Sequence, residues 1–390
     1  MSLKNDKGLK LTLEPYSKET NELLGFKIKD VPSKKQECLI SEETYLVKKG
    51  NDIIQIESQE EIEKKDNEEL LFLIKIRQGN SIKLFHPPKK NINFQKDEYV
   101  NNLDNKLWYT IKYNNSNSED LNDDYFLKEN DIIIIGNLKY KVYEIKFQQD
   151  FEEEENEEKE EKENNIDAEA INEYINVNIN SEMVFDSAPK IKKNKNKNNK
   201  CRFCNCCNVS LCQCDKIVHL TCLKEKIMKE FDDSIENDKQ TVITYKIKDF
   251  YCEKCMIPYP IKFRIDENDS KESFDVFDID KNRYPNYIML ESLGHKNENG
   301  GYQKTVYIIK LSENIIKIGR NKDNDVIIDD PSIKDYHAEI KFINTNKKIL
   351  LENKTDKPDI AVLIKNPLKM NNKKIHLQCG RIFFEAKINT

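Results

Sequence analysis

Glycine is scarce in this sequence, with only ten among 390 residues. No glycine-rich loop of the kind that surrounds nucleotide phosphates is found, and neither is a Ser/His/Asp triad. The longest apolar run, Leu70–Ile76, is far shorter than the roughly 20 residues that a membrane-spanning helix needs. The 64 basic and 70 acidic residues leave a net charge of −6, without the basic excess of a nucleic-acid binder. We therefore expect no nucleotide chemistry, no membrane span and no nucleic-acid partner.

Charge is concentrated in two runs near the middle of the chain. Glu152–Glu163 holds nine glutamates and two lysines, and Lys190–Lys200 holds six lysines among asparagines. Like charges repel one another within each run, so we expect residues 150–200 to be a flexible, disordered linker. The basic run lacks arginine and aromatic side chains that would contact phosphates or stack on bases, which favours a tether over a nucleic-acid arm.

Short β-type segments precede this linker. They are rich in β-branched and aromatic residues and are separated by polar loops: Leu9–Leu13, Phe26–Lys29, Asp52–Ile56, Ser81–Phe85 and Trp108–Tyr113. The clearest pattern is Ile132–Ile135, then Gly136-Asn137, then Leu138–Ile145, which predicts a hairpin. We expect residues 1–149 to form a β-sandwich-like domain with Trp108 in its core.

A second set of β-type segments follows residue 285. Its members are Tyr287–Leu293, Val306–Leu311, Ile315–Arg320, Asp325–Ile328, Tyr336–Phe342, Ile349–Leu351, Ala361–Ile364 and a last hairpin ending at Ile388. Short strands at this spacing predict a β-sandwich over residues 285–390. Gly136–Ile145 and Gly380–Ile388 end the two sets in a similar way, so residues 1–149 are a candidate degenerate copy of the second domain.

Cysteines gather between the two β-rich parts. Nine of the eleven cysteines lie in residues 201–255, and paired clusters separated by short spacers account for most of them. Such pairs are typical of zinc sites in a reducing compartment, since both sulfurs of a pair can turn onto one ion. Two tetrahedral zinc ions need eight ligands, and the sequence offers Cys201, Cys204, Cys212, Cys214, His219, Cys222, Cys252 and Cys255. Cys206 and Cys207 are extra thiols that either replace a ligand or are spare.

The order of these ligands resembles that of RING-CH fingers, which occur in some ubiquitin ligases. The resemblance implies that Cys201, Cys204, His219 and Cys222 hold one zinc ion and that Cys212, Cys214, Cys252 and Cys255 hold the other. The loops after Cys204 and Cys214 are shorter than in that class, and the spacing before His219 also suits a PHD finger.

Such ligases present an apolar surface to a ubiquitin-conjugating enzyme and have no catalytic side chain of their own. By this resemblance Phe203 is the candidate contact in the first cysteine pair. The predicted helix Leu223–Phe231 has Lys226 where a tryptophan is expected, so the usual anchor of that contact is missing. The resemblance therefore favours a structural zinc finger over an enzyme.

Residues 285–390 resemble a forkhead-associated (FHA) domain, on the strength of Gly319-Arg320, Asp325–Asp329 and Tyr336–Ile340. The resemblance implies a β-sandwich that binds phosphothreonine peptides through loops at one end. Arg320 matches the arginine that binds phosphate in this family, and a planar guanidinium suits two phosphate oxygens. His337 corresponds to a histidine that braces a loop.

The resemblance is weaker at the other recognition positions. Lys334 stands where the family has a phosphate-binding serine, with Ser332 two residues earlier and Asp335 at a position that is usually basic. The family's Ser-x-Asn-Gly-Thr turn corresponds to Thr355–Asp359, without the Asn and the Gly. The candidate phosphopeptide-binding residues are Arg320, Lys334, Ser332 and Thr355.

We expect a mainly β, multidomain protein that is intracellular, cytoplasmic or nuclear, and similar to ciliate-type proteins that combine an FHA domain with a RING-CH finger. Its expected parts are residues 1–149, the linker 150–200, the finger 201–260, a connector 261–284 and the FHA-like domain 285–390. The expected function is that of a zinc-binding adaptor for a phosphorylated or acidic protein partner. A ubiquitin ligase with a conjugating-enzyme partner, or a structural assembly component with a degenerate FHA domain, are the alternatives.

Overall fold

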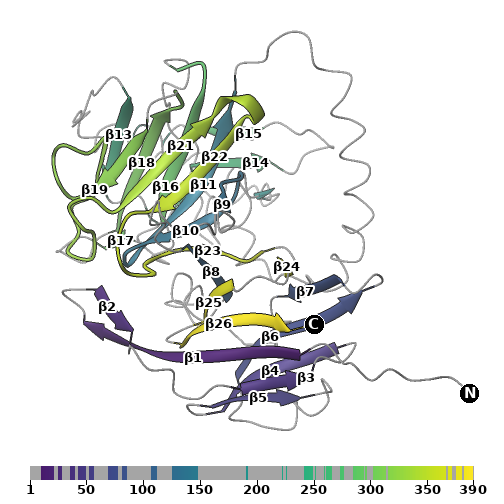
Figure 1. Cartoon of the computed structure of the whole chain (residues 1–390). Helices are drawn as coiled ribbons and strands as arrows, with labels where there is room; N and C mark the ends of the chain where they lie inside the picture. Colours follow the sequence, from purple (N-terminus) through teal and green to yellow (C-terminus); the bar gives the residue numbers. More distant parts are fainter. Residues whose placement is uncertain are drawn as a thin grey trace, which may run out of the picture.

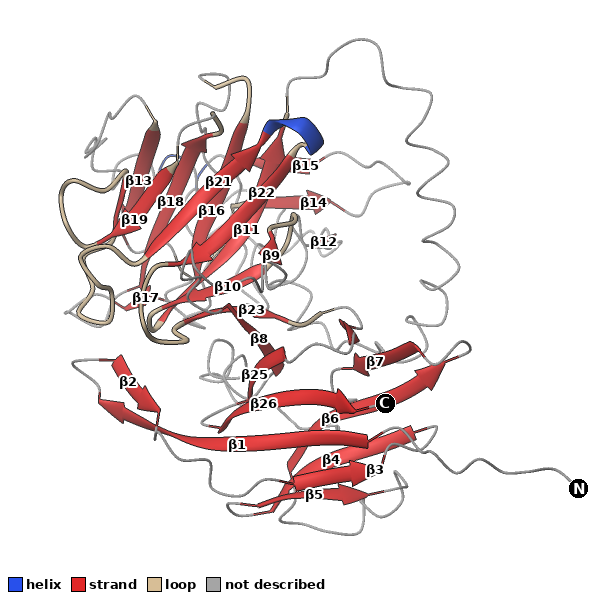
Figure 2. Cartoon of the chain, in the orientation of Figure 1, coloured by secondary structure: helices blue, strands red, loops and turns tan. Residues whose placement is uncertain are grey.

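The computed structural model describes residues 107–111, 125–147, 190–191, 222, 225, 241–248, 251, 259, 261–265, 273–275, 284–293, 295–296, 302–312, 315–365, 368–370, 375–379 and 382–389, together with the strands of residues 10–85. Strands dominate this part of the chain (Figure 2). The expectation of a mainly β protein is therefore confirmed. No helix among the described residues is long and apolar enough to cross a bilayer.

Two sheets face each other in the upper half of Figure 1 and form a sandwich. The smaller sheet has five strands in the order β20 (Val326–Ile327), β19 (Ile316–Gly319), β21 (Ala338–Ile343), β22 (Lys348–Asn353) and β9 (Tyr125–Phe126). A short 3-10 helix, η2 (Asn344–Asn346), joins β21 to β22.

The larger sheet begins with seven strands that complete the sandwich. Their order is β13 (Val242–Lys248), β18 (Tyr302–Lys310), β16 (Tyr287–Leu293), β11 (Leu138–Lys146), β10 (Ile132–Ile135), β23 (Ile360–Leu363) and β8 (Leu107–Ile111). The sheet continues through β25 (Ile375–Cys379), β26 (Ile382–Asn389), β1 (Lys10–Asn21) and β2 (Gly25–Ile28). Two short strands pair beside this path, β17 (His295–Lys296) with β18 and β3 (Gln36–Leu39) with β1.

Two further sheets complete the described strands. One has the order β24 (Leu368–Met370), β7 (Ser81–Phe85), β6 (Glu69–Arg77), β4 (Glu43–Lys49) and β5 (Asp52–Ile56), and β4 to β7 lie below the sandwich in Figure 1. The other has β12 (Lys190–Ile191), β14 (Lys262–Ile265) and β15 (Ser273–Asp275). The two residues of β12 belong to the expected linker and pair with β14.

The core of the sandwich follows from the two-residue period of its strands. Ile133 of β10 and Val362 of β23 are paired and point into the core, where side chains from both sheets pack together. Trp108 of β8, Ile132 of β10 and Ala361 of β23 are fully or nearly fully buried in a second cluster. Burying each large apolar side chain contributes roughly 1.5–3 kcal/mol to folding, so both clusters stabilise the fold. Trp108 is a core residue, as predicted.

The predicted hairpin around Gly136-Asn137 is confirmed, but its neighbours were not expected. Ile135 pairs with Leu138 across the two-residue turn. However, β10 also pairs with β23, and β11 pairs with β16. Strands from before residue 149 and after residue 285 therefore share one sheet and one core, and the expected boundary at residue 149 does not separate two sheets.

The predicted zinc-binding segment also contains a strand of the sandwich. β13 lies in the sequence between Cys222 and Cys252, and it pairs along its length with β18. Val242 of β13 is fully buried in the main core. Just beyond Cys255, Tyr259 and Ile261 are buried too, and the Lys304 ammonium of β18 donates a hydrogen bond to the Tyr259 carbonyl. The chain is therefore anchored to the larger sheet on both sides of the last cysteine pair.

Candidate functional site

Three loops of the sandwich lie at the same end. β19 runs antiparallel to β21, and β21 runs antiparallel to β22. The loop after β19 (residues 320–325), the loop before β21 (residues 328–337) and the loop after β22 (residues 354–359) must therefore lie together, away from η2. Figure 2 shows loops at this end in tan. We call this region the loop end of the sandwich.

Backbone contacts hold Arg320 next to Lys334. The Arg320 N–H donates to the Lys334 carbonyl at 2.9 Å, and Gly319 lies so close to residue 335 that an added Cβ would be 2.3 Å from its carbonyl oxygen. Only a glycine fits this approach, which explains the Gly-Arg pair of the motif. Both cations are exposed to solvent. The fold thus brings together the two basic residues that the sequence predicted for this site.

Arg320 also has an acidic neighbour. Its guanidinium donates a hydrogen bond to the Asp335 carboxylate at 3.2 Å, and both side chains are exposed, Arg320 by 47% and Asp335 by 74%. The Asp335 carbonyl accepts a hydrogen bond of 2.6 Å from the buried Asn324 amide. Neither Asn324 nor the pairing of Asp335 with Arg320 was predicted from the sequence.

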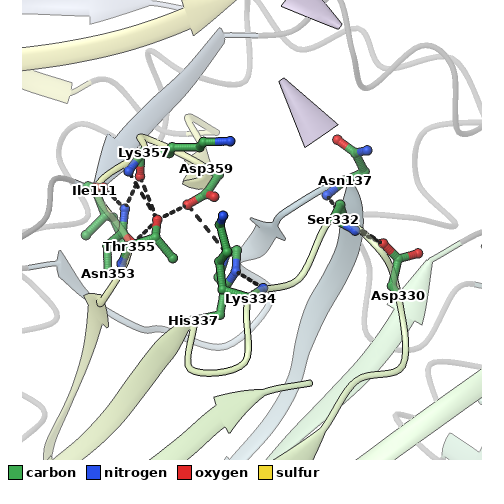
Figure 3. Close-up of polar contacts among 10 residues, drawn as sticks. All are labelled: Ile111, Asn137, Asp330, Ser332, Lys334, His337, Asn353, Thr355, Lys357 and Asp359. Atoms are coloured by element: carbon green, nitrogen blue, oxygen red, sulfur yellow. Dashed lines mark hydrogen bonds and ion pairs between the residues drawn. The ribbon is translucent and has the colours of Figure 1, made fainter. Parts of the chain in front are cut away.

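A buried histidine joins the second loop to the third (Figure 3). The Lys334 N–H donates to His337 Nδ1 at 3.0 Å, so the proton of the neutral ring is on Nε2, which lies 3.4 Å from Asp359 Oδ1. Burial lowers the pKa of His337 to about 4, with a smaller effect from the positive charge of Lys334. Burial raises the pKa of Asp359 to about 6, and the hydrogen bond from Thr355 opposes this. His337 therefore braces the loops, as the resemblance implied.

The third loop is held by side chains that point inward. The Asn353 amide donates to the carbonyls of Ile111 and Lys357, and its oxygen accepts from the Thr355 N–H and lies 3.0 Å from the Thr355 hydroxyl. The Thr355 hydroxyl also lies 2.6 Å from Asp359 Oδ1. Figure 3 shows these groups gathered beside His337. The network replaces the Asn-Gly turn that the FHA resemblance would have placed here.

Ser332 is directed at a different part of the fold. Its hydroxyl donates to Asp330 Oδ1 at 2.5 Å and accepts a hydrogen bond of 2.9 Å from the Asn137 N–H in the β10–β11 turn. Gly136 has a φ of +62°, and an added Cβ would lie 2.6 Å from the Ser332 oxygen. In Figure 3 this contact lies on the far side of Lys334 from Thr355. Ser332 therefore ties the second loop to the β10–β11 turn.

The four predicted phosphopeptide residues thus differ in their surroundings. Arg320 and Lys334 are adjacent and exposed, which favours them as ligand contacts. The hydroxyls of Ser332 and Thr355 are hydrogen-bonded within the protein, and the two residues are only 9% and 4% exposed. Phosphate contact by any of the four stays a prediction, and the geometry supports it for the two basic residues.

The predicted zinc site lies largely outside the described residues. Cys222 alone among the eight candidate ligands is described, as a half-buried residue in helical conformation. Phe203, Cys206 and Cys207 are outside the described part as well. Within that part, no three His, Cys, Asp or Glu side chains are grouped so that they could hold a metal ion. The assignment of two zinc ions stays a prediction.

Comparison with known proteins bears on the loop end of the sandwich. No curated protein and no solved structure matches the chain. The family model of the FHA domain matches residues 316–379, which run from the start of β19 to the end of β25 and include all three loops. The part of this chain that carries Arg320, Lys334 and His337 is therefore an FHA domain.

Proposed function

We propose that this protein is an adaptor that binds a phosphorylated segment of a partner protein at the loop end of its FHA domain. The observation that carries the proposal is the hydrogen bond from the Arg320 N–H to the Lys334 carbonyl, which places the backbones of two exposed basic residues next to each other. A guanidinium can donate two parallel hydrogen bonds to a phosphate, and a nearby ammonium adds a point charge. The FHA match supports this reading, since FHA domains bind phosphorylated protein partners.

The proposal assigns different roles to the four candidate residues. Arg320 contacts the phosphate directly, and Lys334 supplies additional positive charge in place of the family's serine hydroxyl. Ser332 and Thr355 act as positioning residues, because their hydroxyls hold the second and third loops in place. The His337–Asp359 contact fixes the distance between those loops.

Binding of phosphothreonine peptides to the full-length chain tests this function. Arg320→Ala should weaken binding about tenfold to a hundredfold, the usual effect of losing charge-assisted hydrogen bonds, and Lys334→Ala should have a smaller effect. Lys317→Ala is the matched control, because Lys317 is an exposed lysine on β19, outside the three loops. Isothermal titration calorimetry measures all four proteins. The proposal is wrong if phosphorylated peptides bind no better than unphosphorylated ones, or if Arg320→Ala leaves their affinity unchanged.

We further propose that the Cys201–Cys255 segment binds two zinc ions in a structural role. The ligand spacing supports this, and so does the anchoring of β13 and Tyr259 to the larger sheet. The metal sites would then connect chain segments that the sandwich already holds at other points. The alternative of a ubiquitin ligase stays a prediction that rests on Phe203 and the cysteine spacing.

A further inference from the structure

We propose that the phosphorylated partner segment carries a basic side chain close to its phosphate, and that Asp335 selects for it. The inference rests on the proposed function and names the class of ligand that this particular site takes. Its basis is the ion pair between Arg320 and Asp335, at 3.2 Å, where the FHA resemblance would have placed a basic residue.

The ion pair is easily opened by a phosphate. Both of its side chains are largely exposed to solvent, and exposed ion pairs contribute little to stability. A phosphate group carries between one and a half and two negative charges at pH 7 and offers oxygens for two parallel hydrogen bonds, whereas Asp335 makes a single one to Arg320. A phosphorylated ligand is therefore able to displace the Asp335 carboxylate from the guanidinium.

After displacement, the Asp335 carboxylate cannot move far away. The backbone carbonyl of residue 335 accepts hydrogen bonds from the Asn324 amide at 2.6 Å and from the Asn321 N–H at 3.2 Å. Gly319 packs directly against this carbonyl. Because the backbone is held in this way, a negative charge stays next to the bound phosphate. Two like charges in proximity repel each other unless a cation lies near both.

The other charges of the loop end point to the same kind of ligand. Asp323 and Asp329 are exposed acidic residues on the first and second loops, and Lys322 is exposed on the first, so the loop end carries charges of both signs. This surface does not suit a ligand that is acidic throughout. A segment in which Lys or Arg lies beside the phosphorylated residue places its negative group on Arg320 and its positive group on Asp335. Of the two partner classes considered from the sequence, the phosphorylated one is therefore favoured over the acidic one.

Three phosphothreonine peptides and one variant test the inference. The peptides carry Lys, Ala or Glu on both sides of the phosphothreonine, and fluorescence anisotropy measures their affinity for the full-length chain. Wild-type protein should bind the Lys-flanked peptide about tenfold or more tightly than the Glu-flanked one, the range expected for close charge pairs near a protein surface. Asp335→Asn should bind the Ala-flanked peptide about threefold to tenfold more tightly than wild type, and should lose most of the preference for Lys.

A matched control separates Asp335 from any other acidic group nearby. Asp356→Asn removes one exposed negative charge from the third loop but leaves the Arg320–Asp335 pair in place, so it should keep the wild-type preference. Phosphopeptide binding by wild type with no preference among the three flanks would overturn the inference and leave the proposed function standing. If neither wild type nor Asp335→Asn binds any of the phosphopeptides, both the proposed function and the inference are wrong.

Discussion

At the scale of single residues, the His337–Asp359 contact combines two opposite pH effects. His337 has a folded pKa of about 4, below its usual 6.5, so acidification from pH 6.5 toward 4 destabilises the fold through this residue. Asp359 has a folded pKa of about 6, above its usual 3.8, so raising the pH from 3.8 through 6 destabilises the fold through that residue. Each pKa shift corresponds to a change of about 3 kcal/mol in the free energy of unfolding. Between pH 4 and 6 the two residues change this free energy in opposite directions with pH, so their effects largely cancel.

Asp359→Asn should separate these effects. The amide oxygen can still accept the hydrogen bond from Thr355 and lie beside His337, but the buried carboxyl that resists ionisation is gone. We expect the variant to be more stable than wild type at pH 7, by about 1–3 kcal/mol, and to lose stability more steeply on acidification to pH 5. Urea unfolding at pH 5, 6 and 7 measures this. The change Asp323→Asn, which removes an exposed charge from the first loop, should leave the profile as in wild type. A variant that is less stable at pH 7 than wild type would contradict the argument.

The candidate site residues differ in how well a sequence motif predicts their surroundings. Arg320 and Lys334 were identified through the FHA resemblance, whose motif of Gly-Arg followed by a histidine-bearing loop lies within one local stretch of chain. The direction of the Ser332 hydroxyl depends on Asn137, which is 195 residues away in the sequence. Sequence spacing carries no information about such a partner. The same is true of Asn353, whose amide reaches Ile111.

At the scale of secondary-structure elements, the β10–β11 turn supports the loop that carries Lys334. Gly136 has a positive φ, and its N–H donates to the Asp359 carbonyl at 2.9 Å. The next N–H, of Asn137, donates to the Ser332 hydroxyl. The predicted hairpin therefore acts as a base for both the second and the third loop. Its role in the site follows from its pairing with β23, which periodicity alone does not reveal.

Gly136→Ala should disturb this support. The new Cβ would lie 2.6 Å from the Ser332 oxygen and 2.8 Å from Ile333 Cδ1, at a φ of +62° that alanine adopts only with strain. We expect a loss of stability of about 1–3 kcal/mol and weaker phosphopeptide binding, because Lys334 follows directly after Ile333. Asn137→Ala is the control, since only its backbone N–H makes the contact to Ser332. Thermal unfolding and peptide titration measure the pair of variants, and equal values for both would show that the turn does not support the loop.

Strand β13 shows why one element was not predicted. From Ile243 to Lys248 apolar and polar residues alternate, which meets the usual description of a strand. It was not assigned because it lies within the cysteine segment, where the ligand spacing suggested a finger and nothing more. In the structure the Thr241 hydroxyl donates to Asp325 Oδ1 at 3.0 Å, so the start of β13 contacts the end of the loop that begins at Arg320. The alternation of apolar and polar residues predicts a strand, whereas the cysteine spacing predicts a metal site. In this stretch of chain both patterns occur together.

At the scale of the whole molecule, the sandwich draws strands from several distant parts of the sequence. Its two sheets combine residues 107–146, 242–248 and 287–363. Most strands of the sandwich were predicted, β9 and β13 excepted, because a strand's two-residue period is visible in its own sequence. Their partners were not, because pairing such as that of Ile133 with Val362 depends on the complete fold. The proposed zinc segment is inserted between two parts of the same sandwich, so its folding should be linked to that of the FHA domain.

Removal of metal should therefore lower the stability of the sandwich. β13 and Tyr259 hold the chain to the larger sheet on both sides of Cys252 and Cys255, and structural zinc sites contribute to folding when ligands come from distant segments. We expect a chelator to release two zinc ions from the full chain, measured by native mass spectrometry, and to lower the melting temperature followed through the phosphopeptide-binding signal of the FHA domain.

The double change Cys252→Ser with Cys255→Ser should reproduce the lower melting temperature without chelator. Cys38→Ser, a change outside the cluster, should keep both the metal content and the melting temperature of wild type. A sandwich that loses its zinc yet melts at an unchanged temperature would show that the two parts fold independently, and that β13 alone is enough to complete the edge of the sheet.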